Sequence, residues 1–589
     1  MRKYPAGIQS FEKPYKQLPL GISDFKRIAL GDYYYVDKTM FIPRLEAASS
    51  YLFFVRPRRF GKSLMLSLLH AYYDISEANR FEELFGRLWI GTHPTPLHNH
   101  YAVLHLDFSL VTGTIDELNN NFNQYCGMVV DAFADQYEKR FFDGFAVKMA
   151  ETHGAVGKLN YLGIMAKKYD VPLYLIVDEY DNFTNTVLSQ HGEDVYRGLT
   201  HGEGFYRDIF KLFKPNFERI LMIGVSPVTM DDLTSGYNIA TNITSDRLFN
   251  QMLGFSEVDV RQMLDYYHAL GLLNGSVEDM VQEMKPWYNN YCFAKESFGT
   301  ESRMFNGNMV LYYLNEQLRN GHAPEAMTDP NTRTDYQKMK RLIQLDKLDG
   351  QRRSIILQIA EEGSISGNIV PYFPASGMVL QENFVSLLYY YGMLTITGVE
   401  GFELRLGIPN NNVRKQYYSY LLEQYDSIAP LNMWQISQYY NKVALYGDWQ
   451  PMFQLLASEY EKCCAVRSLM EGERNMQGFF TALLTQCPYY LIAPELELNH
   501  GYCDFFLMPD LRRYPMINHS YIIELKYLKQ GSIDSEKAAQ WQEAVGQLLS
   551  YTADEKVRLL CGCTTLHPVI MQFCGHTMIR MEEIDFNEK

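Results

Sequence analysis

Residues 56–64, RPRRFGKSL, contain the residue types that bind nucleoside phosphates. In such a loop, backbone N–H groups and the start of a helix hold the phosphates, the Lys contacts the outer ones, and the Ser hydroxyl holds Mg²⁺. The general pattern has Gly where this chain has Arg56, so the loop cannot follow the usual backbone path in full. We expect ATP and Mg²⁺ as cofactors. The expected nucleotide-binding residues of the loop are Arg58, Arg59, Phe60, Gly61, Lys62, Ser63 and Leu64, and Ser63 is also an expected metal ligand.

An acidic pair follows a second apolar segment. Residues 172–177, PLYLIV, are apolar enough for a strand buried on both faces, and Asp178 and Glu179 come directly after it. Asp178 would hold the Mg²⁺ shell, and Glu179 would orient and deprotonate the attacking water. Each motif alone is weak, because buried strands that end in acidic residues are common. Together, and in this order, they indicate a nucleotide-binding site.

Further elements are expected in the same sheet. The pattern predicts strands at residues 101–108 and 219–225, and one long helical stretch over about 114–149. Ser226 or Thr229, after the last strand, could sense the γ-phosphate; a simple strand-ending turn is the equal alternative. Arg247 could act on a neighbouring subunit's nucleotide, but a surface salt bridge is the favoured interpretation.

Six motifs follow one another along this part of the chain: LPLGISDF at 18–25, YYVDKTMFI at 34–42, RPRRFGKSL at 56–64, LIVDEYDN at 175–182, LGFSEVDV at 253–260 and WYNNYCF at 287–293. With these motifs the chain resembles a bacterial AAA-ATPase-like family over roughly residues 15–300. In that family Arg also stands at the first Gly position of the loop. The resemblance implies an additional strand between the loop strand and the acidic strand, and a helical lid that begins near Gly254.

The C-terminal segment predicts one helix and three strands. The helix is expected over residues 471–484, a strand over 489–498, a turn and strand from 501, and a third strand, YIIELK, over 521–526. This order resembles the PD-(D/E)xK nuclease superfamily, in which a carboxylate starts one strand and an acid-x-Lys triplet lies on its hairpin partner. The resemblance therefore assigns Asp504, Glu524 and Lys526 as catalytic residues. Tyr502 stands where relatives tend to have Arg, so one substrate contact differs.

The spacing of these residues has a physical reason. Residues two apart on a strand point to the same face, so Glu524 and Lys526 can converge. Asp504 and Glu524 across a hairpin would hold Mg²⁺ against the scissile phosphate, and Lys526 would orient or activate the attacking water. Glu473, and with less support Glu497, would complete the metal shell. A downstream helix with Gln547 would brace the site.

The middle of the chain, residues 300–455, is less informative. A helix over 383–391 and a hairpin over 393–409, turning at 398–401, are typical of a winged-helix-like unit. Such units read DNA or serve as packing spacers, and this one lacks a basic recognition helix.

Composition limits the class of protein. The 589 residues include 54 basic and 69 acidic ones, and the net charge of −15 argues against a chain that coats nucleic acid non-specifically. The nine Cys include no CxxC pair and fit reduced thiols better than disulfides or a zinc site. No run approaches the roughly 20 apolar residues of a membrane span, and we expect a cytoplasmic protein without a membrane partner.

These observations predict an α/β fold: an AAA-like P-loop NTPase parallel sheet with a helical lid, a mainly helical, winged-helix-like middle region, and a C-terminal restriction-endonuclease-like domain. The expected boundaries are 1–250 for the ATPase core, 251–320 for the lid, 321–455 for the linker domain and 456–589 for the nuclease-like domain.

The expected function is ATP binding and hydrolysis coupled to a Mg²⁺-dependent nuclease. The expected partner of the C-terminal domain is nucleic acid, DNA rather than RNA, in a mobile-element or defence setting. A homo-oligomer is compatible with the sequence. The alternative is a nucleotide-sensing switch or scaffold whose C-terminal domain binds nucleic acid or protein without cutting. A third possibility is a degenerate ATPase in which Arg56 fills part of the nucleotide pocket.

Overall fold

The computed structural model describes residues 15–182, 184, 186–187, 193–200, 205–228, 240–299, 303–329, 351–466, 472–498 and 501–585. The chain divides into two compact units. The first comprises residues 1–349 and 366–411, and the second comprises residues 350–365 and 412–589. The finer four-part division stays a prediction.

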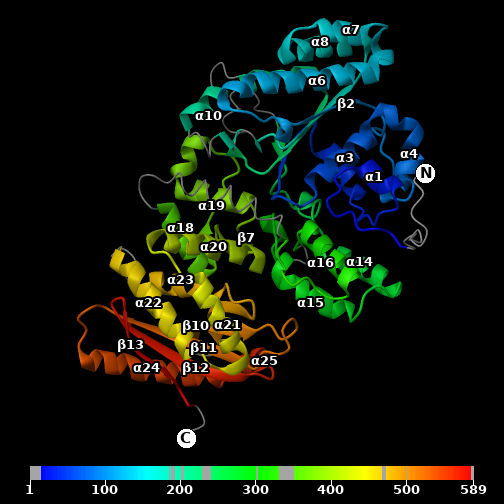
Figure 1. The fold of residues 1–589 in the computed structure, drawn as a ribbon. Coiled ribbons are helices and arrows are strands. Elements are labelled where there is room, and N and C mark those ends of the chain that lie inside the picture. The colour runs from blue at the N-terminus through cyan, green and yellow to red at the C-terminus, as the bar shows by residue number, and fades with distance from the viewer. Residues whose placement is uncertain are drawn as a thin grey trace, which may run out of the picture. The chain divides into compact units, whose positions relative to one another are not determined.

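The first unit is built on a five-stranded sheet with the order β2-β3-β4-β1-β5, in which all neighbouring strands are parallel (Figure 1). Every residue of β3 is buried, as its apolar sequence predicts. Strand β4 lies between β1 and β3, which confirms the additional strand. Because the strands are parallel, the loop after β1 and the acidic pair after β3 lie at the same edge of the sheet. The strands are β1 (Tyr51–Val55), β2 (Ala102–Asp107), β3 (Leu173–Asp178), β4 (Arg219–Gly224) and β5 (Thr241–Asn242).

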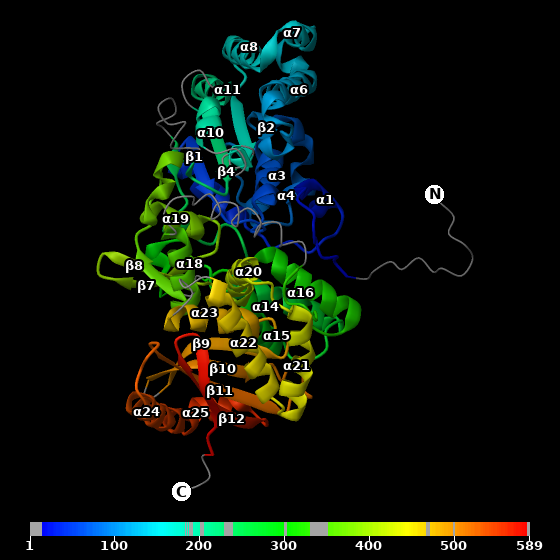
Figure 2. The same ribbon diagram turned by 60° about the vertical axis from the view of Figure 1, so that its left-hand side comes forward.

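Helices connect these strands, and α6, α7 and α8 lie together on the β2 side of the sheet (Figures 1 and 2). The prediction of one helical stretch over 114–149 was wrong in part, because the chain turns at Gly144, whose φ of +88° is left-handed. The α-helices up to β4 are α1 (Phe25–Leu30), α2 (Ile42–Ala48), α3 (Lys62–Tyr73), α4 (Phe81–Phe85), α5 (Trp89–Thr92), α6 (Ile115–Phe141), α7 (Phe145–Glu151), α8 (Gly154–Tyr169), α10 (Glu193–Thr200), α11 (Phe205–Lys211) and α12 (Phe213–Asn216). The 3₁₀ helices of this unit are η1 (Thr39–Phe41), η2 (Ile75–Arg80), η3 (Phe108–Leu110), η4 (Arg247–Phe249), η5 (Lys295–Ser297) and η7 (Ala375–Val379).

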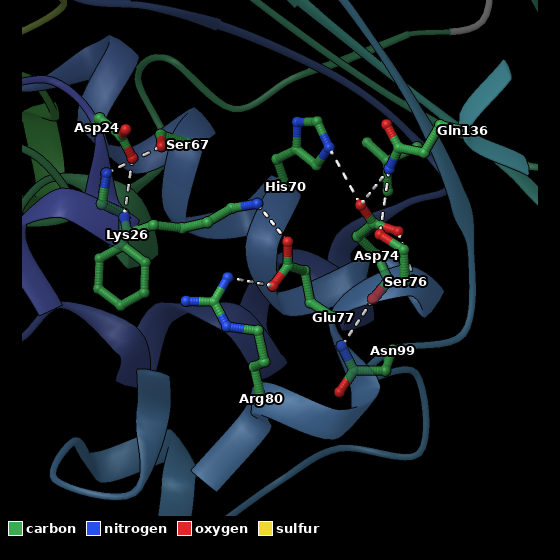
Figure 3. Close-up of polar contacts among 12 residues, drawn as sticks. Asp24, Lys26, Ser67, His70, Asp74, Ser76, Glu77, Arg80, Asn99 and Gln136 are labelled. Carbon is green, nitrogen blue, oxygen red and sulfur yellow. Dashed lines mark hydrogen bonds and ion pairs between the residues drawn. The ribbon is translucent and has the colours of Figure 1, made fainter. Parts of the chain in front are cut away.

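Asp74 fastens the end of α3 to α6 (Figure 3). Its buried carboxylate accepts hydrogen bonds from the Ser76 backbone N–H at 2.8 Å and the Tyr137 hydroxyl at 2.8 Å. The Gln136 amide donates to it at 3.2 Å, and His70 Nε2 lies 3.4 Å away. Because α3 begins at the phosphate-loop residues, this contact fixes the far end of the helix that carries them.

Three helices follow Gly254 and form the expected lid. They are α14 (Glu257–Ala269), α15 (Val277–Tyr288) and α16 (Gly307–Asn320). Gly254 has a φ of +81° and its N–H donates to the Phe60 carbonyl at 2.9 Å. A Cβ at this position would lie 2.8 Å from the Phe305 carbonyl oxygen, so the close approach of the lid to the loop requires glycine.

The middle region contains the predicted helix and hairpin. Helix α19 (Gln381–Tyr390) precedes strands β7 (Thr395–Glu400) and β8 (Glu403–Gly407), which pair antiparallel around Gly401 at φ +62°. Strand β6 (Ser364–Gly367) lies where the chain passes between the two units.

The second unit contains a mixed five-stranded sheet with the order β13-β12-β11-β10-β9. Strands β9, β10 and β11 pair antiparallel, whereas β11 and β12 are parallel. The sheet lies between α24 and α25 on one face and α21, α22 and α23 on the other (Figures 1 and 2). Apolar side chains of α24, including Trp541 and Leu548, pack against Phe506 and Ile522 of the sheet. The strands are β9 (Tyr490–Leu498), β10 (Gly501–Pro509), β11 (His519–Leu528), β12 (Thr565–Cys574) and β13 (Thr577–Glu583).

The helices of this unit account for the predicted order around the strands. Helix α23 (Glu473–Leu484) precedes β9, and α24 (Asp534–Thr552) follows β11 and carries Gln547. Within the described ranges, no helix combines the length and the apolar character needed to cross a membrane. The other helices are α18 (Gln351–Glu362), α20 (Asn411–Ile428), α21 (Met433–Tyr446), α22 (Gln450–Val466) and α25 (Glu555–Cys561).

Candidate functional site

A cavity of about 430 Å³ lies where the loop after β1 meets the acidic end of β3. Residues 58–65 of the loop and the start of α3 line one side, and Glu179 lines the cavity from β3. The lid helices contribute Met263 from α14 and Asn308 and Leu311 from α16, and Phe255 lines the cavity just before α14. All seven predicted loop residues, 58–64, therefore border one cavity of a size suited to a small molecule.

The loop ends in the geometry that its sequence predicts. Gly61 has a φ of +94° and stands as the N-cap of α3, and Lys62 is the first residue of that helix. The Lys62 ammonium donates to the carbonyl oxygens of Arg56 and Pro57, each at 3.1 Å. Burial lowers the pKa of Lys62, and the nearby charges of Glu179 and Asp178 oppose that effect. The ammonium therefore lies among loop carbonyls within electrostatic range of both acids.

Ser63 and Asp178 are brought into contact. The Ser63 hydroxyl hydrogen-bonds the Asp178 carboxylate, and this bond lowers the Asp178 pKa; burial, the larger effect, raises it to about 6. Asp178 Oδ1 also accepts the Glu179 N–H at 2.9 Å. Glu179 has a left-handed φ of +46°, which is uncommon for a residue with a side chain.

Arg56 has a different place. Its side chain is fully buried and is absent from the residues that line the cavity. The guanidinium donates to the carbonyl oxygens of Thr244 at 2.6 Å and Phe249 at 3.1 Å, and it lies over the rings of Phe54 and Phe293. Burial lowers its pKa to about 9. Arg56 therefore anchors the end of β1 to the segment around η4 and does not fill the cavity.

The other sensor candidates lie away from the cavity lining. Ser226 is buried, its hydroxyl oxygen accepts the Val228 N–H at 3.2 Å, and it does not line the cavity. Thr229 lies outside the described residues. Arg247 is exposed in η4 and has no ion-pair partner in the part of the chain that the structure describes.

The sequence interpretation missed one wall of the cavity. It is formed by the N-terminal segment, whose lining residues include Ile22, Tyr34, Tyr35, Val36 and Lys38. These residues belong to the quoted motifs LPLGISDF and YYVDKTMFI, so the resemblance contained a signal, but their distance from the loop in sequence gave no reason to place them there.

A second set of predicted residues meets in the C-terminal sheet. Phe505 pairs with Ile523, so Asp504 and Glu524 occupy the next positions across the two strands. Asp504 Oδ2 accepts the Leu525 N–H at 2.7 Å, and Lys526 Nζ donates to Glu524 Oε1 at 2.7 Å.

The two carboxyls share a buried environment. Burial raises the pKa of Asp504, and the charge of Glu524 raises it further. Burial likewise raises the pKa of Glu524, while Lys526 opposes the shift. Glu524 Oε2 is buried, and no group of the described residues lies in hydrogen-bonding geometry with it. An unsatisfied buried carboxylate oxygen is costly, so this atom needs a proton or a cation.

The neighbouring helices add polar groups that the sequence only partly predicted. Gln477, which the sequence analysis missed, donates to Asp504 Oδ1 at 2.6 Å. It lies one helical turn after Glu473, which is exposed at the start of α23 and whose charge raises the Glu524 pKa. Gln547 Nε2 donates to Glu543 at 3.5 Å, and its buried Oε1 has no hydrogen-bond partner among the residues that the structure describes. The side chain of Glu497 lies outside the described residues.

Both constellations fit Mg²⁺ chemically. Mg²⁺ prefers oxygen ligands and keeps several waters, so one or two carboxylates suffice. Ser63 and Asp178 would hold it in the first unit; Asp504 and Glu524, with the unpartnered Oε2, would hold it in the second. Among the described residues, no group of three or more His, Cys, Asp and Glu is arranged to hold a metal by itself.

Comparisons with known proteins match two separate segments of the chain to protein families. Residues 19–234 match the family described as "Predicted AAA-ATPase", and residues 471–583 match the PD-(D/E)XK nuclease superfamily. An uncharacterized protein from the vnfD 5′ region of Azotobacter chroococcum mcd 1 is 29% identical over 285 residues, which are 48% of this chain and 50% of that protein. The chain thus spans half the length of this curated relative. A Walker-type ATPase of Pyrococcus abyssi aligns with a TM-score of 0.36 at 13% identity, over 69% of this chain and 99% of that one.

One segment of the chain, residues 19–234, therefore matches a predicted AAA-ATPase family, and a second segment, residues 471–583, matches the PD-(D/E)XK nuclease superfamily.

Proposed function

We propose that the protein binds and hydrolyses ATP in its first unit and cleaves nucleic acid, DNA rather than RNA, in its second. The observation that supports the first activity is the contact between Ser63 and Asp178 beside a buried Lys62. A hydroxyl and a carboxylate next to a phosphate loop are the two groups that position Mg²⁺ on a nucleoside triphosphate. DNA processing in a mobile-element or defence setting is the context that we propose.

Different residues of the cavity would bind the phosphates and activate the attacking water. The backbone around Gly61 and the start of α3 would bind the phosphates, and Lys62 would leave the carbonyls of Arg56 and Pro57 for the outer phosphate oxygens. Mg²⁺, when bound, neutralises charge on the phosphoryl oxygens. Glu179 lines the same cavity and would orient the attacking water and take its proton.

Glu179→Gln tests this assignment. The amide keeps the size of the side chain but cannot take a proton, so we expect turnover to fall by about 100-fold or more while ATP affinity is kept. Lys62→Ala should weaken affinity itself. The measurements are phosphate release and equilibrium binding of a fluorescent ATP analogue, with Asp135→Asn on the exposed face of α6 as the control. Turnover at the wild-type rate in Glu179→Gln would contradict the assignment.

The second activity rests on one arrangement. Asp504 and Glu524 lie across neighbouring strands, and Lys526 contacts Glu524. Within the part of the chain that the structure describes, Glu524 Oε2 is buried without a hydrogen-bond partner. Mg²⁺, when bound, polarises the scissile phosphate and stabilises the leaving oxygen. Lys526 lies beside Glu524 and would hold the attacking water in line with the phosphate. Gln477 would fix the orientation of Asp504 through its 2.6 Å hydrogen bond.

Lys526→Ala is the direct test of nuclease activity. With Mg²⁺ and single- or double-stranded DNA, we expect the wild-type protein to nick or degrade substrate and the variant to lose about 100-fold or more of the rate. Lys529→Ala, an exposed lysine three residues further on, is the matched control and should retain activity. Parallel assays with RNA test the preference for DNA. Equal inactivity of wild type and Lys526→Ala on all substrates would refute cleavage.

One observation favours a second candidate, a nucleotide-sensing switch or scaffold that binds without cutting. Burial raises the pKa of both Asp504 and Glu524, which favours the protonated forms over the carboxylates that would bind Mg²⁺ for cleavage. Tight ATP binding with negligible turnover, unaffected by Glu179→Gln, would support the switch. DNA binding that persists in Lys526→Ala without cleavage by the wild type would support the scaffold.

A further inference from the structure

Asp181 joins the ends of two central strands. It follows the acidic pair of β3 and is only 1% exposed. Its Oδ2 accepts the Ser226 N–H at 2.7 Å, and its two oxygens accept the Val225 N–H at 3.2 and 3.3 Å. Val225 and Ser226 come directly after β4, the strand between β1 and β3. One buried carboxylate therefore fastens the turn after β3 to the end of β4.

Tyr180 also fastens the turn after β3 to the end of β4, and we call the contacts of Tyr180 and Asp181 with residues 223–226 the junction. Its hydroxyl donates to the Ser226 carbonyl, and its own carbonyl accepts the hydroxyl of Tyr206 from α11. Its backbone N–H donates to the Ile223 carbonyl at 3.4 Å. Gly224 leaves room for this packing, because a Cβ there would lie 2.2 Å from the Tyr180 ring and 2.5 Å from Asp181 Oδ1.

Glu179 stands between this junction and the cavity. Its φ of +46° is a conformation that a residue with a side chain adopts only when its surroundings hold it. Before Glu179 in the chain, Asp178 Oδ1 accepts the Glu179 N–H at 2.9 Å. After it, Tyr180 and Asp181 form the hydrogen bonds to the end of β4 described above. The left-handed backbone of Glu179 is thus fixed from both sides in sequence.

We propose that Asp181 is a positioning residue for Glu179: it holds the turn after β3 against β4 so that the Glu179 carboxylate points into the nucleotide cavity. This rests on the proposed ATPase function. Asp181 does not line the cavity, so it acts through the backbone of its neighbours and not on the nucleotide. The same bonds occupy the Ser226 N–H, so this backbone group is part of the junction.

The test uses the full-length protein and the variant Asp181→Asn. The amide can accept the Ser226 N–H with its single oxygen, but its NH₂ group then faces the Val225 N–H, so the junction loosens while its volume is kept. Because small displacements of a catalytic group are costly, we expect turnover per bound nucleotide to fall by about 10- to 100-fold. ATP affinity should stay within about twofold, since the loop is unchanged. Asp135→Asn is the matched control.

A double variant separates positioning from general structural damage. If Asp181 acts through Glu179, Glu179→Gln combined with Asp181→Asn should be no slower than Glu179→Gln alone. Multiplication of the two losses in turnover would overturn the inference.

If Asp181→Asn does not fold, Tyr180→Phe removes the hydroxyl bond to Ser226 and keeps the ring, and the same non-additivity with Glu179→Gln is expected. Wild-type turnover in Asp181→Asn, with a large loss in Glu179→Gln, overturns the positioning role alone. Equal turnover of wild type and Glu179→Gln overturns the proposed ATPase assignment and, with it, this role.

Discussion

Arg56 shows how one residue can depart from a motif without entering the site. Because Arg56 stands at the first Gly position of a phosphate loop, the sequence allowed its long, charged side chain to fill part of the nucleotide pocket. Instead its guanidinium is buried between Phe54 and Phe293 and donates to the carbonyls of Thr244 and Phe249. A buried charge is tolerated only with such partners. The part of the loop that borders the cavity therefore begins after Arg56, at Arg58.

The raised pKa of Asp178 gives a prediction for pH. Burial raises this pKa to about 6, and only the carboxylate form can bind Mg²⁺. The affinity for Mg²⁺–ATP should therefore rise with pH through about 6, and Asp178→Asn should remove the dependence. Equilibrium binding measured across about one pH unit on each side checks this.

The stability of the metal-free protein should change with pH in the opposite direction to its affinity for Mg²⁺–ATP. Because the folded-state pKa of Asp178 is raised, the metal-free protein gains stability from the protonated form at low pH, and this contribution is lost as the pH rises through about 6. Saturating Mg²⁺–ATP should cancel the loss, because it binds the carboxylate form. A metal-free stability that increases over the same range in wild type but not in Asp178→Asn would contradict the assignment.

At the scale of elements, α3 connects the phosphate loop to the α6 helix. Its first residues, Lys62 and Ser63, face the cavity, and its C-terminal end is held at Asp74 by groups from α6 (Figure 3). Burial raises the Asp74 pKa, but the hydrogen bonds of His70, Ser76 and Tyr137 outweigh burial and lower it overall. The carboxylate therefore stabilises the fold above the ordinary aspartate pKa, and this contribution is lost as the pH falls through the lowered value.

Asp74→Ala should destabilise the first unit. It removes the carboxylate that accepts from the buried Tyr137 hydroxyl and leaves the Gln136 amide with Ser76 Oγ as acceptor. We expect a loss of about 2–4 kcal/mol in the free energy of unfolding. Denaturant unfolding measures this loss. Glu83→Gln, in an exposed ion pair with Arg80, should change stability by less than about 0.5 kcal/mol and is the control. A loss in Asp74→Ala no larger than in the control would show that the hydrogen bonds of Asp74 contribute nothing to the stability of the first unit.

For the whole molecule, two compact units and two separate sites predict independent responses to ligands. ATP at about 100 times its dissociation constant should stabilise the unit that binds it by about 2.7 kcal/mol. In calorimetry, ATP should move the unfolding transition of the first unit and leave that of the second in place. Lys62→Ala should abolish this shift, whereas Asp504→Asn should keep it. A single transition that both variants change equally would contradict the separation into two sites.

The sequence by itself determined those features that depend on neighbouring residues. The apolar runs of β1, β3 and β4, the glycine before α3 and the two-residue spacing of Glu524 and Lys526 follow from local chemistry and periodicity, and the order of motifs established both domain types. The break at Gly144 was missed because a single left-handed residue between two helical patterns carries little signal.

Only the tertiary structure decided which distant residues meet. Nothing in the local pattern of Tyr34, Lys38 or Gln477 places them beside a loop or strand far away in the chain, because contacts of this kind depend on how elements pack and not on spacing. The same holds for Asp181, which the sequence presents as one more acid after a strand. Its burial against the N–H groups that directly follow β4 depends on strand order, and strand order is settled by the whole sheet.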